Sequence, residues 1–121
     1  MSSYVLWLDT QEAHIYKFLP GKVEKQNLKN THPQHHTHNP KEEKHPSDHF
    51  YHEVANALSQ AQELLIVGPG IAQEQFKHHL EKHHHGALNQ KVLSVESMGH
   101  CTDGQIEAHA RKFFKTQHLF S

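Results

Sequence analysis

The stretch ELLIVGPG, Glu63 to Gly70, decides the fold of this 121-residue chain. It is a continuous apolar run from Leu64 to Val67 that ends in a turn with two glycines and a proline. An apolar run without polar alternation is typical of a strand buried on both faces of a sheet. Such a turn can receive a phosphate at a helix N-terminus, but it lacks the GxGxxG and P-loop lysine patterns, which favours a simple tight turn.

Three β-rich runs precede this strand: YVLWLDT (4–10), EAHIYKFLP (12–20) and KVEKQNL (22–28). Residues 9–12 make a turn between the first two, and Pro20-Gly21 is a turn signal between the second and the third. The runs therefore predict a three-stranded antiparallel meander. Its third strand, whose apolar members are Val23 and Leu28, is expected at an exposed edge.

Three amphipathic helices are predicted around the apolar strand. Ser47 or Asp48 caps the first helix, Gly86 closes the second, and Thr102 or Asp103 caps the third. The inward positions are Phe50, Tyr51, Val54, Ala57, Leu58 and Ala61 in the first helix, Ile71, Gln75 or Phe76, His79, Leu80 and His83 in the second, and Ile106, Ala110, Phe113 and Phe114 in the third.

A further strand, KVLSVESM (91–98), lies between the second and third helices. A meander followed by alternating helices and strands predicts a mixed sheet with helices on its faces. We therefore expect an α/β fold of the ribonuclease-H-like, three-layer type, with about five strands and three helices. At 121 residues the chain is expected to form a single domain.

A histidine-rich segment separates the meander from the first helix. Seven of the 16 histidines lie between Thr31 and Glu53, and three prolines in this stretch oppose regular structure. The absence of apolar periodicity predicts a long polar loop at about residues 30–47, and loops of this length inside compact domains are usually functional or disordered. The histidines are not gathered at a chain end, as those of a purification tag would be.

Histidine makes the charge of the chain depend on pH. The formal net charge is −1 with neutral histidines. With an ordinary pKa near 6.5, about four of the imidazoles are protonated at pH 7 and about twelve at pH 6. We expect acid-enhanced binding to polyanions. The N-terminus lacks a secretory pattern, no apolar run could span a membrane, and Cys101 has no disulfide partner in the chain, which favours a cytoplasmic protein.

The sequence resembles a family of small proteobacterial proteins described as translational machinery proteins. The resemblance is carried by WLDTQEAHIYKF, the histidine-rich loop, FYHEVANAL, ELLIVGPGIAQEQFKHHLEKH and HCTDGQIEAHARKFF. More remotely, the order of elements is similar to the middle domain of archaeal and eukaryotic class-1 release factors and of Pelota. This resemblance implies a translation-related accessory protein without catalytic activity, with the ribosome or RNA as partner.

In the release factors that the chain resembles, the connection after the meander carries a Gly-Gly-Gln motif that reaches the peptidyl-transferase centre. The corresponding loop here contains no glycine, so peptidyl-tRNA hydrolysis is not carried over. The letters DGQ at residues 103–105 lie at an expected helix start, where capping explains them. The residues expected to contact RNA or a partner are His32, His35, His36, His38, Lys41 and His45.

Imidazole density supports a second hypothesis, a protein that binds Zn²⁺ or Ni²⁺. The candidate metal ligands are His35, His36, His38, His49, His52 and Glu53. His79 and His83, four residues apart on the second helix, form a second candidate chelate. The simpler interpretation of this second cluster, which also includes His78, His84 and His85, is a solvated helix end, where cationic histidine is favourable.

A third hypothesis is a Mg²⁺-dependent nuclease. Ribonuclease-H-like nucleases hold their metal ions with clustered carboxylates, and Asp9 ends the first strand with Glu12 close by. Glu63 and Glu96 are the nearest further candidates, but the spacing does not force the four together. Asp9 as a hairpin-turn residue is the simpler interpretation.

Overall fold

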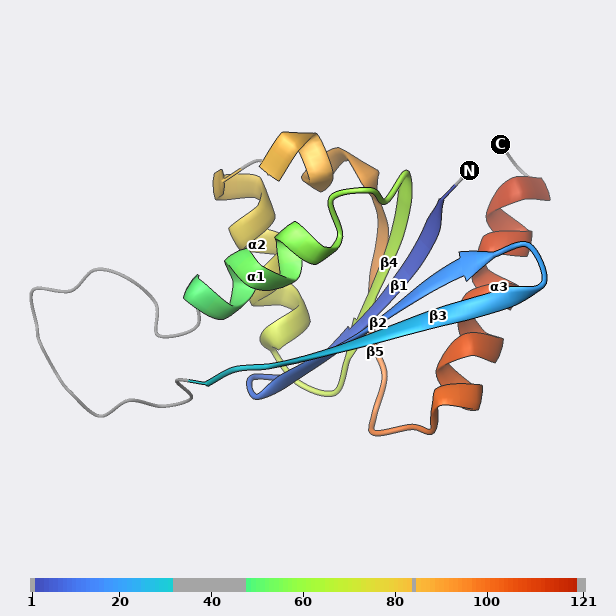
Figure 1. The fold of residues 1–121 in the computed structure, drawn as a ribbon, viewed down its shortest axis with the longest axis horizontal. Coiled ribbons are helices and arrows are strands. Elements are labelled where there is room, and N and C mark those ends of the chain that lie inside the picture. Colours follow the sequence, from blue (N-terminus) through green and yellow to red (C-terminus); the bar gives the residue numbers. More distant parts are fainter. Residues whose placement is uncertain (1, 32–47, 84, 120–121) are drawn as a thin grey trace, which may run out of the picture.

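The computed structural model describes residues 2–31, 48–83 and 85–119, which form one mixed five-stranded sheet with helices on both faces (Figure 1). The strands are β1 (Ser3–Leu8), β2 (Glu12–Leu19), β3 (Lys22–Lys29), β4 (Glu63–Gly68) and β5 (Val92–Ser97). Their order across the sheet is β3-β2-β1-β4-β5. The pairs β1–β2 and β2–β3 are antiparallel, whereas β1–β4 and β4–β5 are parallel. The predicted α/β fold, with a meander followed by crossovers, is confirmed.

Helices α1 (Asp48–Ala57) and α2 (Ala72–His83) lie on one face of the sheet, and α3 (Asp103–Leu119) lies on the other (Figure 1). A short 3₁₀ segment, η1 (His85–Lys91), follows α2 and leads into β5; the sequence pattern did not predict it. These helices and the sheet make the three layers expected of the fold.

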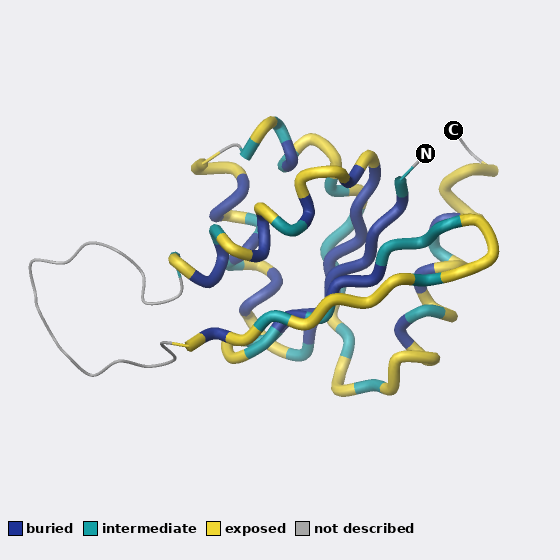
Figure 2. The backbone as a smooth tube through the Cα atoms, in the orientation of Figure 1, coloured by how far each residue is buried: buried dark blue, intermediate teal, exposed yellow. Residues whose placement is uncertain are grey.

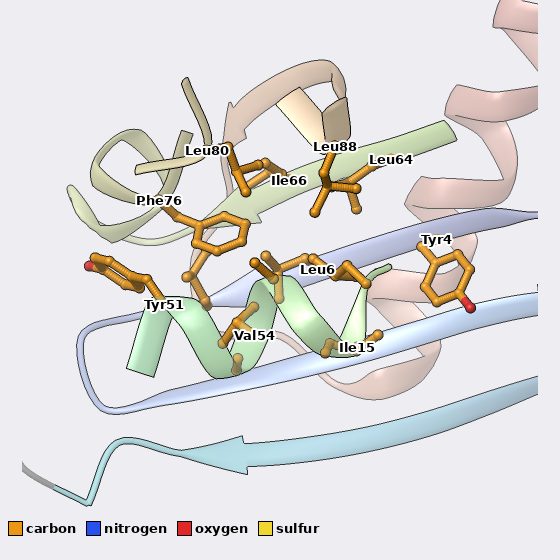
Figure 3. Packing of buried hydrophobic residues seen from close by; sticks show 14 of the residues in the cluster. Tyr4, Leu6, Ile15, Tyr51, Val54, Leu64, Ile66, Phe76, Leu80 and Leu88 are labelled. Carbon is orange, nitrogen blue, oxygen red and sulfur yellow. The ribbon is translucent and has the colours of Figure 1, made fainter. Parts of the chain in front are cut away.

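The central strands alternate between two cores. On β1, Leu6 belongs to the cluster under α1 and α2, and Trp7 belongs to the cluster under α3. On β4, the residues of the predicted interior strand, Leu64 to Val67, are fully buried. The edge strand β3 is mostly exposed, as predicted (Figure 2). Figure 3 shows Phe76 and Leu80 of α2 packed with Ile66 in the first core.

The helix faces follow the predicted periodicity, with two exceptions: Ile71 and His83 are predicted to face inward, but both are exposed. Phe76, His79 and Leu80 of α2 are buried, and so are Ile106 and Phe114 of α3. The inward placement of Ile71 is wrong, since its side chain is 65% exposed. Ile71 precedes the first residue of α2 and lies in the turn after β4, where the helical period does not yet apply.

The end of β4 approaches β1 closely. A Cβ atom on Gly68 would clash with the backbone carbonyl oxygen of Leu8 and would lie 2.6 Å from Oε1 of Gln73. The Gly68 carbonyl accepts hydrogen bonds from Gln73 Nε2 (3.0 Å) and from the backbone N–H of Met98 (2.7 Å). Gly70, two residues later, has open space around its Cα. The first glycine of the turn is therefore required by packing.

Gly68→Ala is expected to lower the free energy of unfolding by about 2–3 kcal/mol, because the added methyl group meets a backbone atom that cannot move without shifting β1. Gly70→Ala is the matched control and should change it by less than about 0.5 kcal/mol. Urea unfolding of both variants measures the difference. Equal stability of the two variants would contradict the close approach.

Candidate functional site

Four histidines gather where the first turns of α1 meet the end of α2 and the start of η1. They are His52, His79, His83 and His85, and together they are called the imidazole cluster below. The distances between their ring centroids range from 4.4 Å for His79–His83 to 6.1 Å for His83–His85. Asp48, one helical turn before His52, lies beside the cluster.

The two helices bring these rings together because both are anchored in the core by neighbouring apolar residues. Tyr51, next to His52, is buried and its ring lies 5.7 Å from that of His79. Phe76 and Leu80 fix α2 on the sheet, and His79 lies between them on the same buried side. His83 follows one turn later and is exposed.

His85 reaches the cluster through an unusual backbone conformation. Its φ angle is 31°, and Gly86 and Ala87 follow with φ angles of 67°. Non-glycine residues rarely adopt positive φ, and such strain persists only where the surroundings enforce it. This turn brings Nε2 of His85 to 3.0 Å from Nε2 of His79. At that distance one nitrogen donates and the other accepts, so the two rings are not both fully protonated.

His79 is the most buried member of the cluster. Its side chain is 3% exposed, and among the described residues its Nδ1 atom has no hydrogen-bond partner. Oδ1 of Asp48 lies 3.6 Å from that atom, which is too long for a hydrogen bond but close enough for charge attraction. A carboxylate on this side favours a proton on Nδ1, and Nε2 then directs its lone pair toward His85.

The surroundings favour the neutral form of two of these imidazoles, those of His79 and His85. Burial, followed by the charges of His52, His83 and His85, lowers the pKa of His79 from 6.5 to about 4, and Asp48 opposes this change. Burial, followed by His52 and His83, also lowers the pKa of His85. Neutral imidazoles are donors for transition metals, so His79 and His85 hold their nitrogens in the form that binds such ions.

Two groups of three side chains place one ligand atom each within 4.8 Å of the others: His52, His79 and His85 form one, and Asp48, His79 and His83 form the other. No other group of this kind occurs within the described residues. A pocket of about 410 Å³ opens beside them, lined by Asp48, Tyr51, Glu74, Gln75, His78, His79, Lys82 and His83.

Of the metal ligands predicted with the loop, only His49, His52 and Glu53 lie within the described residues. His52, predicted with the loop histidines, lies instead against His79 and His83 of the second candidate chelate. His49 and Glu53 pair with each other at 2.9 Å on the outer side of α1. The predicted loop residues, which lie outside the described residues, are His32, His35, His36, His38, Lys41 and His45.

Sequence reasoning missed two members of the site. The sequence predicts Asp48 only as a helix cap and His85 only as part of a solvated helix end. That solvated interpretation fits His83 and is wrong for His79, which is buried. The burial of His79 is predictable from the sequence, because this residue falls on the predicted inward side of its helix.

The carboxylates of the nuclease hypothesis do not gather. Oδ1 of Asp9 accepts hydrogen bonds from the backbone N–H groups of Gln11 and Glu12, both at 2.8 Å, as expected of a hairpin-turn residue. Glu63 lies at the opposite end of the parallel strands from Asp9 and is hydrogen-bonded by Ser3 and His118. Neither group of metal-ligating side chains includes these carboxylates.

The DGQ letters have a structural explanation. The Gln105 backbone N–H donates to Thr102 Oγ1 (3.2 Å), and the Thr102 N–H donates to Gln105 Oε1 (2.9 Å). This reciprocal pair is a capping box, so Thr102 caps α3. Asp103 accepts hydrogen bonds from Tyr16 and Lys25, which lower the pKa of its carboxyl.

No family model and no curated protein matches this chain by sequence. Among solved structures it is similar to the archaeal translation termination factor aRF1, with a TM-score of 0.60 and 13% identity over 98% of this chain and 40% of that one. The *Archaeoglobus fulgidus* Pelota protein gives a TM-score of 0.61 and 17% identity over 98% and 34% of the two chains.

*Saccharomyces cerevisiae* Dom34, a translation termination-like factor, gives a TM-score of 0.59 and 9% identity over 88% of this chain and 31% of its own. This chain thus spans 40% or less of these three proteins. The comparisons establish a shared fold. They agree with the remote resemblance to release factors and Pelota noted from the sequence. In the part of the chain that the structure describes, no helix is long and apolar enough to cross a membrane.

Protonation of His79 is expected to destabilise the metal-free protein. The lowered pKa means that the unfolded chain takes up a proton near pH 6.5, whereas the folded chain takes it up only near pH 4. Stability is therefore lost as the pH falls through this interval, by about 3 kcal/mol for His79 at about 1.4 kcal/mol per pH unit. Urea unfolding in the presence of a chelator measures this dependence.

His79→Gln removes the titrating group and is the comparison for that measurement. Between pH 7 and pH 4.5 the free energy of unfolding of the wild type should fall by about 2–3 kcal/mol more than that of the variant. Parallel curves for the two proteins would show that His79 is protonated as easily in the folded as in the unfolded chain.

Proposed function

We propose that this chain is a non-catalytic accessory protein of translation that contacts the ribosome or RNA through the histidine-rich connection between β3 and α1. The observation that carries the proposal is the likeness in fold to a translation termination factor and to Pelota over 98% of the chain. The resemblance of the sequence to small proteobacterial translational machinery proteins supports it too, and we infer membership of that family. A cytoplasmic location follows from the proposed partner.

Both described ends of the connection are held to the body of the protein. Asn30 is buried, its N–H donates to the Gln11 carbonyl (2.7 Å), and its side-chain amide donates to the Thr10 carbonyl (3.1 Å). Asp48 begins α1, whose next turns are packed in the core. Firm anchors at both ends suit a segment that presents side chains to a large partner.

The chemistry of the connection supports contact and gives no support to hydrolysis. Residues 30–47 hold five histidines and two lysines, Lys41 and Lys44, and no glycine.

 Imidazoles can stack on unpaired RNA bases, and their protonation below about pH 6.5 adds phosphate-binding charge. The Gly-Gly-Gln motif of the release factors that the chain resembles has no counterpart here.

Co-sedimentation with ribosomes through a sucrose gradient at physiological salt tests the proposal. The full chain is expected in a ribosomal fraction, with more bound at pH 6 than at pH 7.5 because the imidazoles become cationic. Replacing the five loop histidines by His32→Gln, His35→Gln, His36→Gln, His38→Gln and His45→Gln should weaken the association by about 10-fold at pH 6.

The matched control carries His78→Gln and His100→Gln, two exposed histidines outside the connection, and should bind as the wild type does. Absence of the wild-type chain from every ribosomal fraction would overturn the proposal. Equal loss of binding in the loop variant and the control would assign the effect to total charge and reject the connection as the contacting surface.

A further inference from the structure

We propose that the imidazole cluster binds one Zn²⁺ ion through His52, His79 and His85, with His83 within reach as the fourth ligand. Asp48 then acts as the outer carboxylate that orients His79. This goes beyond the proposed role in translation, and neither proposal depends on the other. It also differs from a site built from the loop histidines, since its three main ligands come from α1, α2 and η1.

The spacing of the rings fits one tetrahedral ion. Two nitrogens about 2.0–2.1 Å from the same zinc ion lie about 3.3 Å apart, close to the 3.0 Å that separates the Nε2 atoms of His79 and His85. Rings bound to one such ion through a single nitrogen have centroids about 5 Å apart. The distances from His52 to His79 and His85 are 4.6 and 4.9 Å, and His79–His85 is 5.0 Å.

His83 completes the arrangement after a small side-chain movement. Its ring centroid lies 4.4 Å from that of His79 and 4.8 Å from that of His52, but 6.1 Å from that of His85. The side chain is exposed near the end of α2, so a change of rotamer meets little resistance. Until His83 turns inward, water can occupy the fourth position, as in open zinc sites.

The buried nitrogen of His79 has the outer partner that zinc-bound histidines usually have. A ligating histidine commonly directs its second ring N–H to a carboxylate, which fixes the tautomer and raises the basicity of the ligating nitrogen. Asp48 lies on the Nδ1 side of His79, and His85 lies on the Nε2 side. The side chain of His79 is 3% exposed, so its orientation is held by packing.

The imidazole nitrogens of the cluster determine which class of metal ion it can bind. Three or four neutral imidazoles suit Zn²⁺, Ni²⁺ and Cu²⁺, whereas Mg²⁺ and Ca²⁺ require mainly oxygen ligands. Zinc is favoured because it takes three or four imidazole nitrogens at tetrahedral positions, which matches the number of histidines in the cluster. The pocket of about 410 Å³ reaches Asp48, His79 and His83 and gives a hydrated cation access to the cluster.

Isothermal titration calorimetry of the chelator-treated full chain with ZnCl₂ tests the proposal. The wild type is expected to bind one ion with a submicromolar Kd. His52→Ala and His85→Ala, at half-buried positions, should each weaken binding by more than about 100-fold, and Asp48→Asn by about 10-fold. Co²⁺ in place of Zn²⁺ should give the intense visible absorption of a tetrahedral site in the wild type, but not in His52→Ala or His85→Ala.

Two matched controls separate this site from other histidines. His78→Ala lies on the same helix and is exposed, and the triple variant His35→Ala, His36→Ala and His38→Ala removes the loop alternative. Both should bind Zn²⁺ as the wild type does. Loss of the tight site in the triple variant, unchanged binding by His52→Ala and His85→Ala, or only weak binding at several sites would each overturn the proposal.

Folding of each variant is checked by circular dichroism, and His52→Gln or His85→Gln replaces an alanine variant that does not fold. Thermal unfolding gives a second measurement, since an ion bound only to the folded state raises Tm. One equivalent of Zn²⁺ should raise the Tm of the wild type and of His78→Ala, and leave that of His85→Gln unchanged. Equal increases in all three proteins would also overturn the proposal.

Discussion

The structure depends on one strand, β4, which is paired on both edges and buried on both faces. Its backbone runs parallel to β1 on one side and to β5 on the other. Leu64 and Ile66 pack under α1 and α2, and Leu65 and Val67 pack under α3. Because side chains alternate between the faces of a strand, a change of register by one residue would exchange the two cores. This one strand therefore fixes where both helical layers lie.

The imidazole cluster is a consequence of that placement. Helix α2 follows β4 after a short turn, and Phe76 and Leu80 hold it against the sheet, so His79 faces α1 at the edge of the core. The tight turn requires Gly68, whose Cα approaches the Leu8 carbonyl. His79 lies about three helical turns after Gly68. Its position is thus set by the packing of the apolar residues on α2.

The sequence was sufficient for the fold because the fold rests on local patterns. An apolar run, three alternating runs with turn residues, and three helical periodicities are each visible within about twenty residues. The site was predictable only in part. His79 and His83 share a helix face by spacing alone, but their meeting with His52 depends on how α1 packs on α2. His85 depends on a left-handed turn that Gly86 marks only in part, since His85 and Ala87 also have positive φ.

Burying an imidazole without a hydrogen-bond partner destabilises the folded chain, and the apolar packing around the ring does not offset this loss. Transferring a polar group from water without a new hydrogen bond costs about 1–3 kcal/mol on the scale of protein mutations. Among the described residues, Nδ1 of His79 is in that position, and three further imidazoles surround the same ring. A leucine at residue 79 would fill this space without that cost. An ion shared by the rings would supply the missing stabilisation, and the carboxylate of Asp48 would then face an imidazole made more acidic by its metal, which strengthens the attraction between them.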